Sequence, residues 1–436
     1  MLLRFIIQNF RSFYSPVQFD MFPNPRRTSF PEHIIEGKVP LLKQAAIYGA
    51  NGSGKSNFIK ALSFLKRFVT DKNFIKKDQL DKSKFRLIQG GNKEPISLIV
   101  EFFNAEQYYI YEIAINSESI EKEALYLSGI GEDNVLLFLR TGNQVKMRTE
   151  QAEDVRFAIE KLLETNPMSS LFALNKEFPI LKDKEIEGAF DWFFHELEIV
   201  KPDSFIPILI ELMASNQPLM EFVNNVFEKL DTGITRLKIN KKAEDQSFDD
   251  EVKSLLNKEI GKDQLLTRMR KNRNMCSLSL ENGKKILKEF LFEQSGKDGY
   301  AGEMDIAVQS DGTVRLLTLI PAFYSAMKGH KTVCVDEIDN SIHPLLIREL
   351  IALFSGSPAS GQLIFTTHEV CLLDQKKLLR PDEVWFTEKH EGETCMYSLN
   401  DFKEHNTISI ENGYLGGRYG GIPFLGLAEL LTTKDD

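Results

Sequence analysis

The chain has little of what marks secreted, membrane-spanning or coiled-coil proteins. Its four cysteines among 436 residues show no CxxC spacing, which argues against a disulfide framework and favours a reduced, cytoplasmic protein. No apolar run approaches the roughly 20 residues of a membrane span, and the opening MLLRFIIQNFRSF turns polar too early for a secretory signal. Prolines interrupt the middle of the chain too often for the unbroken heptads of a long coiled coil.

An excess of positive charge is also missing. With 54 Lys and Arg against 63 Asp and Glu, the net charge is −9, so nucleic acid would need a local basic patch. One stretch offers it, TRMRKNRN, where basic side chains would share a helical face: Arg268, Arg270, Lys271 and Arg273. We favour a solvated face balanced by the acids of EDQSFDDE, and nucleic-acid binding stays open.

What the chain does have is a glycine loop, GANGSGKS, between the short apolar strand QAAIY and a helical pattern that begins at Lys55. It matches the phosphate-loop (Walker A) pattern GxxxxGK[ST] in the required strand–loop–helix context. Backbone N–H groups would surround the phosphates of ATP, Lys55 would reach the β- and γ-phosphates, and the Ser56 hydroxyl would bind Mg²⁺. The predicted nucleotide-binding residues of this loop are Gly49, Ala50, Asn51, Gly52, Ser53, Gly54, Lys55, Ser56 and Asn57.

A phosphate loop also needs carboxylates. The best candidate strand is TVCVDEID, which delivers Asp336 and Glu337 at its end (Walker B). Asp336 would hold Mg²⁺ through its water shell, and Glu337 would orient or deprotonate the attacking water. Two alternatives remain: a solvated strand end, and the acidic strand end of a TOPRIM-type nuclease. The second needs further carboxylates on a separate strand and a glycine after the acids, which the sequence does not convincingly supply.

The hydrophobic period predicts an α/β protein in three parts. After the first helix, apolar residues recur every second position, which predicts antiparallel strands over KFRLIQ, ISLIVEFF, YYIYEIAIN, SIEKEALYL, VLLFLR and NQVKMR. From about Thr149 the period becomes helical, in QAEDVRFAIEKLLET, IEGAFDWFFHELEIV and FIPILIELM, and TRLKIN and KKILKEFLFEQ then look like strands. The last third alternates helix and strand. We therefore expect two parts of one domain at 1–148 and 301–436, separated by a mainly helical insertion at 149–300.

Five stretches carry a family resemblance: QNFRSF near the start, QSDGTVRLL, NSIHP and FTTHE around the acidic strand, and the closing ENGYLGGRYGGIP. Their order resembles an ABC-type ATPase head of the structural-maintenance-of-chromosomes (SMC) kind, with a large insertion between the Walker motifs. The tail is similar to the AAA_15 and AAA_21 ATPases of bacterial defence loci, such as the ATPase subunit (AriA) of PARIS anti-phage systems, and to OLD-family relatives. The resemblance covers roughly residues 1–130 and 300–436.

The resemblance implies further site residues. Ser310, Asp311 and Gly312 would begin the signature helix, which touches the nucleotide of a partner subunit, although Asp311 replaces the usual first glycine. His368 would be the switch histidine that contacts the γ-phosphate. Arg11 would approach the nucleotide or form a salt bridge, and Arg418 would bind an anion or pack.

These residues predict a Mg²⁺-dependent ATPase acting as a conformational switch. Implied partners are a second copy (a dimer of heads or a larger ring) and a protein effector or phage-protein trigger, with no membrane. The alternatives are an SMC-like DNA-repair ATPase that clamps DNA, a nuclease, and a small-molecule phosphotransferase. Nicking of plasmid that stops when Asp339 alone is changed would support the nuclease.

Overall fold

The computed structural model describes residues 1–148, 153–179, 181, 183–202, 209–230, 232–243, 266–269, 275–402 and 409–422. Contacts divide the chain into two units. Unit 1 comprises Met1–Ile199, Ala326–Ile338 and Arg348–Asp436, and unit 2 comprises Val200–Ser325 and Asp339–Ile347. Within the described ranges, no helix has the length and apolar character needed to cross a membrane.

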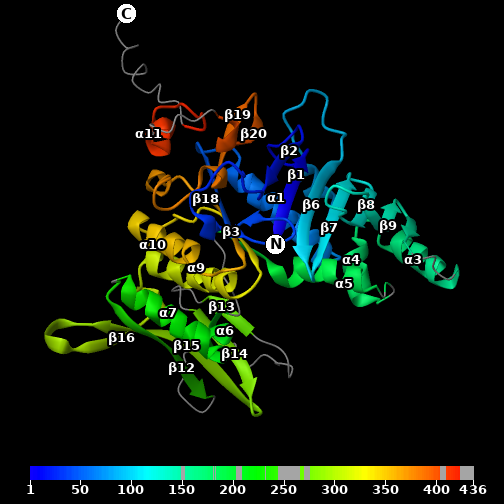
Figure 1. Cartoon of the computed structure of the whole chain (residues 1–436). Coiled ribbons are helices and arrows are strands. Elements are labelled where there is room, and N and C mark those ends of the chain that lie inside the picture. Colours follow the sequence, from blue (N-terminus) through cyan, green and yellow to red (C-terminus); the bar gives the residue numbers. More distant parts are fainter. Residues whose placement is uncertain are drawn as a thin grey trace, which may run out of the picture. The chain divides into compact units, whose positions relative to one another are not determined.

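The central sheet of unit 1 positions the phosphate loop. Its strands follow the order β11-β17-β18-β5-β19-β20, and β17, β18, β5 and β19 pair in parallel. The bounds are β5 Gln44–Gly49, β11 Leu197–Val200, β17 Thr332–Val335, β18 Gln362–Thr366, β19 Val384–His390 and β20 Glu393–Ser398. Strands β5, β17 and β18 are buried throughout, as expected of parallel strands covered on both faces. Because these strands are parallel, their carboxyl ends share one edge, where the loop begins. Figure 1 shows β18, β19 and β20 of this sheet.

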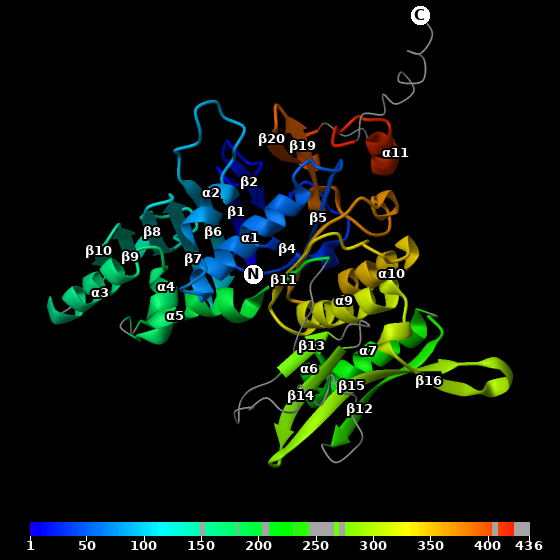
Figure 2. The same cartoon turned by 180° about the vertical axis from the view of Figure 1, so that it is seen from behind.

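A second, antiparallel sheet of unit 1 follows the order β10-β9-β8-β7-β6-β1-β2. Its strands are β1 Leu2–Gln8, β2 Val17–Asp20, β6 Ile96–Asn104, β7 Gln107–Ile115, β8 Ile120–Leu127, β9 Val135–Thr141 and β10 Gln144–Met147. Helix α1 (Lys55–Thr70) lies against this sheet (Figure 2). The ring of Phe58 on α1 lies 5.8 Å from that of Phe5 and 4.9 Å from that of Phe19. The predicted class, an ABC/SMC-like α/β head with a mixed sheet and an antiparallel part, is confirmed.

The first helices after residue 149 belong to unit 1 and not to a separate insertion. These are α3 (Glu153–Thr165), α4 (Leu171–Glu177), α5 (Lys184–Asp191) and a π-helical turn, Trp192–Glu196. They pack on the antiparallel sheet; the ring of Trp192 stacks on Phe102 with centroids 4.3 Å apart. The apolar faces that suggested an independent helical domain are thus part of the core of the head.

Unit 2 combines helices α6 (Leu209–Ser215) and α7 (Gln217–Lys229) with an antiparallel sheet. Its strands are β12 Ile234–Ala243, β13 Leu266–Met269, β14 Met275–Glu281, β15 Lys284–Ser295 and β16 Ala301–Asp305. The predicted strands TRLKIN and KKILKEFLFEQ are confirmed as parts of β12 and β15. In the described residues between 230 and 300, the alternating pattern builds a sheet in place of the mainly helical insertion expected there.

The remaining elements follow the predicted order. Helix α9 (Asp311–Lys328) precedes β17, and α10 (Pro344–Ser355) separates β17 from β18, which confirms the α/β pattern of the last third. The other elements are α2 (Lys77–Ser83), α11 (Ile410–Leu415), β3 (Ile34–Ile35) and β4 (Leu41–Leu42).

Three local predictions are wrong in part. KFRLIQ is not a strand, because the peptide groups of Phe85 bond to side chains: its N–H to Asn9 (3.3 Å) and its carbonyl to Asn92 (2.8 Å). LEIV, predicted as the end of a helix, is strand β11 at the edge of the central sheet.

The third correction concerns TRMRKNRN. Its first residues lie in strand β13, so the predicted helical face is not formed there. Arg270, Lys271 and Arg273 lie outside the described residues.

Candidate functional site

The phosphate loop leaves the carboxyl end of β5, and helix α1 begins at Lys55. Gly54, the residue before the helix, has φ 119°, a conformation that side-chain-bearing residues rarely adopt. The first N–H groups of a helix have no partner within it, and they carry the positive end of the helix dipole. The loop and the start of α1 therefore have the strand–loop–helix geometry that the predicted phosphate site needs.

Lys55 is nearly buried and lies along the loop. Its ammonium group donates to the carbonyls of Gly49 (2.7 Å) and Ala50 (3.2 Å). It also lies 3.4 Å from Nδ1 of His368, which must be the acceptor because an ammonium has only donors. The structure thus brings together the predicted phosphate lysine and the predicted switch histidine, which are far apart in the sequence.

The two acids lie at the carboxyl end of β17, which β18 separates from the phosphate-loop strand β5. Asp336 follows β17, is 4% exposed, and accepts a 2.7 Å hydrogen bond from the Thr366 hydroxyl. The N–H of Glu337 donates to the same hydroxyl oxygen at 2.7 Å. Glu337 has φ 48°, a left-handed conformation that turns the chain directly after the strand. Sequence reasoning missed Thr366, although it stands in the quoted stretch FTTHE.

These oxygens fit the predicted metal. Mg²⁺ prefers oxygen ligands and keeps several waters, and a hydroxyl from Ser56 with a carboxylate from Asp336 is a donor set of that kind. The hydrogen bond from Thr366 fixes the direction of the Asp336 carboxylate. In the described part of the chain, no group of three or more His, Cys, Asp or Glu side chains is arranged to hold a metal ion by itself.

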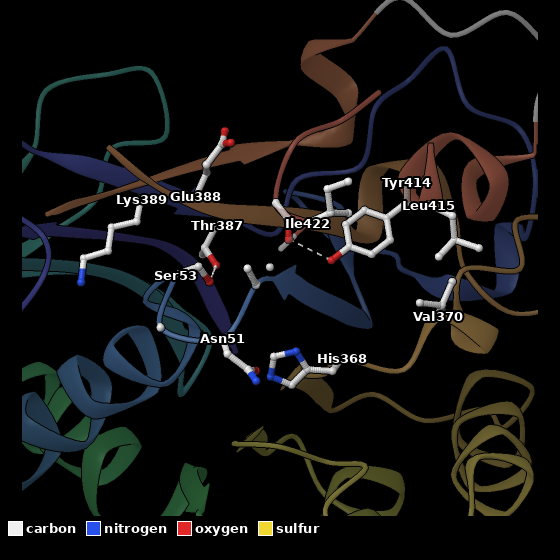
Figure 3. A pocket seen from close by; sticks show the side chains of 14 residues that line it. Asn51, Ser53, His368, Val370, Thr387, Glu388, Lys389, Tyr414, Leu415 and Ile422 are labelled. Carbon is white, nitrogen blue, oxygen red and sulfur yellow. Dashed lines mark hydrogen bonds between the residues drawn. The ribbon is translucent and has the colours of Figure 1, made fainter. Parts of the chain in front are cut away.

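A pocket of about 800 Å³ lies beside the loop (Figure 3). Loop residues, His368 and strand β19 line it together with the C-terminal tail. The full set is Gly49, Ala50, Asn51, Gly52, Ser53, His368, Val370, Thr387, Glu388, Lys389, Tyr414, Leu415, Gly421 and Ile422. Its size suits a ligand such as a nucleotide.

The tail residues of this pocket were not predicted as site residues. Tyr414 stacks on Phe386 with centroids 5.5 Å apart, and its hydroxyl donates to the carbonyl of Gly421 (3.0 Å). Tyr397 holds the same segment by donating to the carbonyl of Tyr419 (2.7 Å). The signal was present in ENGYLGGRYGGIP, where two tyrosines alternate with glycine pairs, but the sequence does not say what the tyrosines contact.

Arg11 lies in the turn after β1 and is not among the residues that line the pocket. Its backbone N–H donates to the carbonyl of Ser83 (2.7 Å). Burial, reinforced by the nearby charge of Arg86, lowers the pKa of its guanidinium. The turn touches α1 through the next residue, Ser12, whose hydroxyl accepts from the side chain of Asn57 (2.8 Å).

The predicted signature residues belong to unit 2. Ser310 caps helix α9, because its side chain accepts from the N–H of Thr313 (3.1 Å) and its carbonyl accepts from the N–H of Val314 (3.1 Å). A Cβ on Gly312 would lie 2.6 Å from the carbonyl oxygen of Ser341, in the NSIHP loop. Glycine at this position therefore lets the signature helix and that loop approach closely. Asp311 is the first residue of the helix.

The chain matches the AAA_21 family, described as "AAA domain, putative AbiEii toxin, Type IV TA system", over residues 45–145 and 277–374. The two segments contain the phosphate loop, the signature helix start, both acids and His368. This match supports an ABC/SMC-like ATPase domain. A search of curated proteins finds no match to the chain.

Among solved structures, the chain is similar to three SMC heads at low identity. One is a crystal structure of an SmcHead bound to the C-winged helix domain of ScpA (14% identity, 95% of this chain and 99% of that chain, TM-score 0.46). The others are the SMC head domain from Thermotoga maritima (12%, 91% and 98%, TM-score 0.41) and a Pyrococcus furiosus head with an extended coiled coil bound to the C-terminal domain of ScpA (12%, 96% and 98%, TM-score 0.44). Because these scores lie below 0.5, the strand order and the phosphate loop carry the fold assignment.

Proposed function

We propose that this protein is a Mg²⁺-dependent ATPase that works as an ATP-driven switch through head-to-head assembly of two or more copies. The observation that carries this proposal is the edge of the central sheet in unit 1. There Lys55 lies 3.4 Å from His368, and Thr366 ties Asp336 and Glu337 together. A cation at the phosphates, a carboxylate for the metal and a residue that orients the attacking water are the parts that hydrolysis of a γ-phosphate uses, and His368 would add a contact to the γ-phosphate.

The roles follow from the chemistry of each group. The loop from Gly49 to Ser56 and the ammonium of Lys55 would bind the phosphates, and Ser56 and Asp336 would hold Mg²⁺, which neutralises phosphate charge when it is bound. Glu337 would orient or deprotonate the attacking water. His368, exposed at the edge of the pocket, would contact the γ-phosphate and register its loss.

The proposed assembly depends on Ser310, Asp311 and Gly312. The start of a helix carries the positive end of the helix dipole, which suits a γ-phosphate, and in our proposal this phosphate is bound by a second copy of the chain. ATP would then lie between two heads and hold them together until hydrolysis. The description of the AAA_21 family as a putative AbiEii toxin supports a role in bacterial defence, where the switch would control a partner effector such as a nuclease in response to a phage protein.

The test is the solution mass by light scattering of the wild type and Glu337→Gln, each without nucleotide, with Mg-ADP and with Mg-ATP. We expect Mg-ATP to drive a dimer or larger assembly that persists in Glu337→Gln, because the variant binds ATP but does not hydrolyse it. Ser310→Arg is the matched variant: it should bind ATP and stay monomeric. A monomeric wild type and Glu337→Gln with ATP bound would overturn the shared site.

A parallel assay separates the competing function. Hydrolysis by the wild type is measured with and without linear double-stranded DNA. Strong stimulation by DNA would favour the DNA-repair clamp over the defence switch.

A further inference from the structure

A chain of hydrogen bonds ties the phosphate loop to two residues outside the predicted site, Ser12 and Thr394. It joins three segments far apart in the sequence: the turn after β1, the first turn of α1 and strand β20. The Asn57 amide lies 2.8 Å from the Ser12 hydroxyl, which lies 2.7 Å from the Thr394 hydroxyl. Thr394 in turn lies 2.7 Å from the carbonyl oxygen of Ser53, in the loop itself.

A carbonyl oxygen only accepts, so the Thr394 hydroxyl donates to Ser53. The same hydroxyl approaches the Ser12 oxygen as a donor, and Ser12 also accepts from the side-chain NH2 group of Asn57. Ser12 therefore links Thr394 to the first turn of α1. Ser12 and Thr394 are 8% and 0% exposed, so water does not compete for the bonds of Thr394 to Ser12 and Ser53.

Holding the Ser53 carbonyl also orients the next N–H. The peptide bond is planar and trans, so the N–H of Gly54 points opposite to the carbonyl of Ser53. With the carbonyl directed at Thr394, the Gly54 N–H is directed to the other side of the loop. That side is the start of α1, where a phosphate would bind.

The loop glycine shows how closely Thr394 approaches. A Cβ on Gly54 would lie 2.2 Å from the Thr394 hydroxyl oxygen, closer than any real contact. The motif glycine is thus required here both by its φ of 119° and by the threonine behind it.

A second pair of hydroxyl groups, those of Ser53 and Thr387, fixes the side chain of Ser53. Thr387 on β19 donates to the carbonyl of Tyr48 (3.2 Å), so Ser53 donates to Thr387 across 2.6 Å. Ser53 is therefore fixed at its side chain by one strand of the β19–β20 hairpin and at its carbonyl by the other.

We propose that Ser12 and Thr394 are positioning residues that hold the Ser53–Gly54 peptide with its N–H toward the phosphates of a bound nucleoside triphosphate. This inference rests on the proposed function, since it concerns the same nucleotide site. It gives the serine of QNFRSF a role that the sequence does not reveal. The hydroxyl of Thr394 prepares the loop, so it affects nucleotide affinity and not the chemical step.

The experiment compares Thr394→Val with Thr394→Ser. Valine keeps the shape and removes the hydroxyl, whereas serine keeps the hydroxyl. We expect Thr394→Val to raise the KM for ATP about tenfold, the effect of losing one hydrogen bond that orients a phosphate donor, with kcat unchanged. Thr394→Ser should restore the wild-type KM. Ser12→Ala should raise KM in the same direction, and it keeps the test available if Thr394→Val does not fold.

Thr332→Val is the matched control. Thr332 is also fully buried on a strand of the same sheet and donates to the side chain of Gln362 (3.1 Å), away from the loop. Thr332→Val should lower the melting temperature as Thr394→Val does, but it should leave the KM for ATP unchanged. The inference is overturned if Thr394→Val melts lower but keeps the wild-type KM, or if serine does not rescue. Failure of the wild type to bind ATP would instead overturn the proposed function.

Discussion

The hydroxyl of Thr366 donates a 2.7 Å hydrogen bond to Oδ1 of Asp336, and this single contact links the ends of strands β18 and β17. The same oxygen accepts the N–H of Glu337 at 2.7 Å. One buried threonine therefore sets both the direction of the predicted metal carboxylate and the backbone of the predicted base. Groups that orient metal ligands in this way are expected to matter nearly as much as the ligands.

Thr366→Val should lower ATP hydrolysis by about 10- to 100-fold, the typical effect of losing a group that orients a metal ligand. Binding of ATP without Mg²⁺ should change little, because the phosphate loop is untouched. Steady-state hydrolysis and calorimetric binding measure the two effects separately. Thr366→Ser keeps the hydroxyl and should retain most activity, so equal loss in both variants would contradict the assigned role.

Two loop glycines make a matched pair for testing the fit of the loop. Gly52 and Gly54 both have positive φ, at 78° and 119°, but a Cβ on Gly52 meets nothing within 4 Å, whereas one on Gly54 meets Thr394 at 2.2 Å. Gly52→Ala should lower the free energy of unfolding by about 1 kcal/mol, the cost of the backbone strain alone. Gly54→Ala should add a steric shift of the loop and abolish ATP binding. Thermal-shift measurements with and without Mg-ATP report the stability and the ATP binding of both variants. If Gly52→Ala and Gly54→Ala behaved alike, the loop would have moved to relieve the clash.

The tail next to the pocket should respond to nucleotide. Arg418 is exposed and lies between Tyr414 and Gly421, which line the pocket and hydrogen-bond to each other at 3.0 Å. A ligand in the pocket should hold this segment in place, so Mg-ATP should slow trypsin cleavage after Arg418. Intact mass spectrometry over a digestion time course identifies that cut.

Tyr414→Phe and Lys55→Ala are the controls for this cleavage. Tyr414→Phe removes the bond to Gly421 and should be cut faster without nucleotide. Lys55→Ala should show no protection, because it cannot bind the phosphates. Protection that persists in Lys55→Ala would show that the tail does not report on the pocket.

The phosphate loop, the acidic strand and the order of the last helices and strands were predictable because each rests on local signals. Gly54, Asp336 and His368 each follow an apolar strand, and carboxyl ends of parallel strands meet at one edge. What escaped prediction depends on partners distant in sequence. Thr394 bonds to Ser53, 341 residues away, and no pattern within either segment indicates it.

The wrong local predictions have the same origin. KFRLIQ alternates like a strand, yet the peptide groups of Phe85 are held by the side chains of Asn9 and Asn92. LEIV follows a helical pattern but joins the edge of a sheet whose other strands come more than a hundred residues later or earlier. In both cases tertiary contacts override the local period.

A buried ion pair in unit 1 provides a prediction on stability. Glu123 on β8 and Arg140 on β9 are both 0% exposed and lie 3.5 Å apart. Glu123 also accepts the N–H of Leu171 at the start of α4 and the hydroxyl of Tyr111 (2.9 Å). Arg140 donates to the carbonyl of Ser169 (2.6 Å), so the pair anchors the segment before α4 to the sheet.

Glu123→Leu should lower the free energy of unfolding by about 3–5 kcal/mol, because it leaves the Arg140 charge buried without its carboxylate. Glu123→Gln keeps an acceptor for Leu171 and Tyr111 and should cost less. In the double variant Glu123→Leu/Arg140→Met the loss should be smaller than the sum of the single losses, since no uncompensated charge remains. Urea unfolding at pH 7 compares the wild type with Glu123→Leu, Glu123→Gln, Arg140→Met and the double variant. Additive losses in Glu123→Leu and Arg140→Met would show that the two side chains stabilise the fold independently.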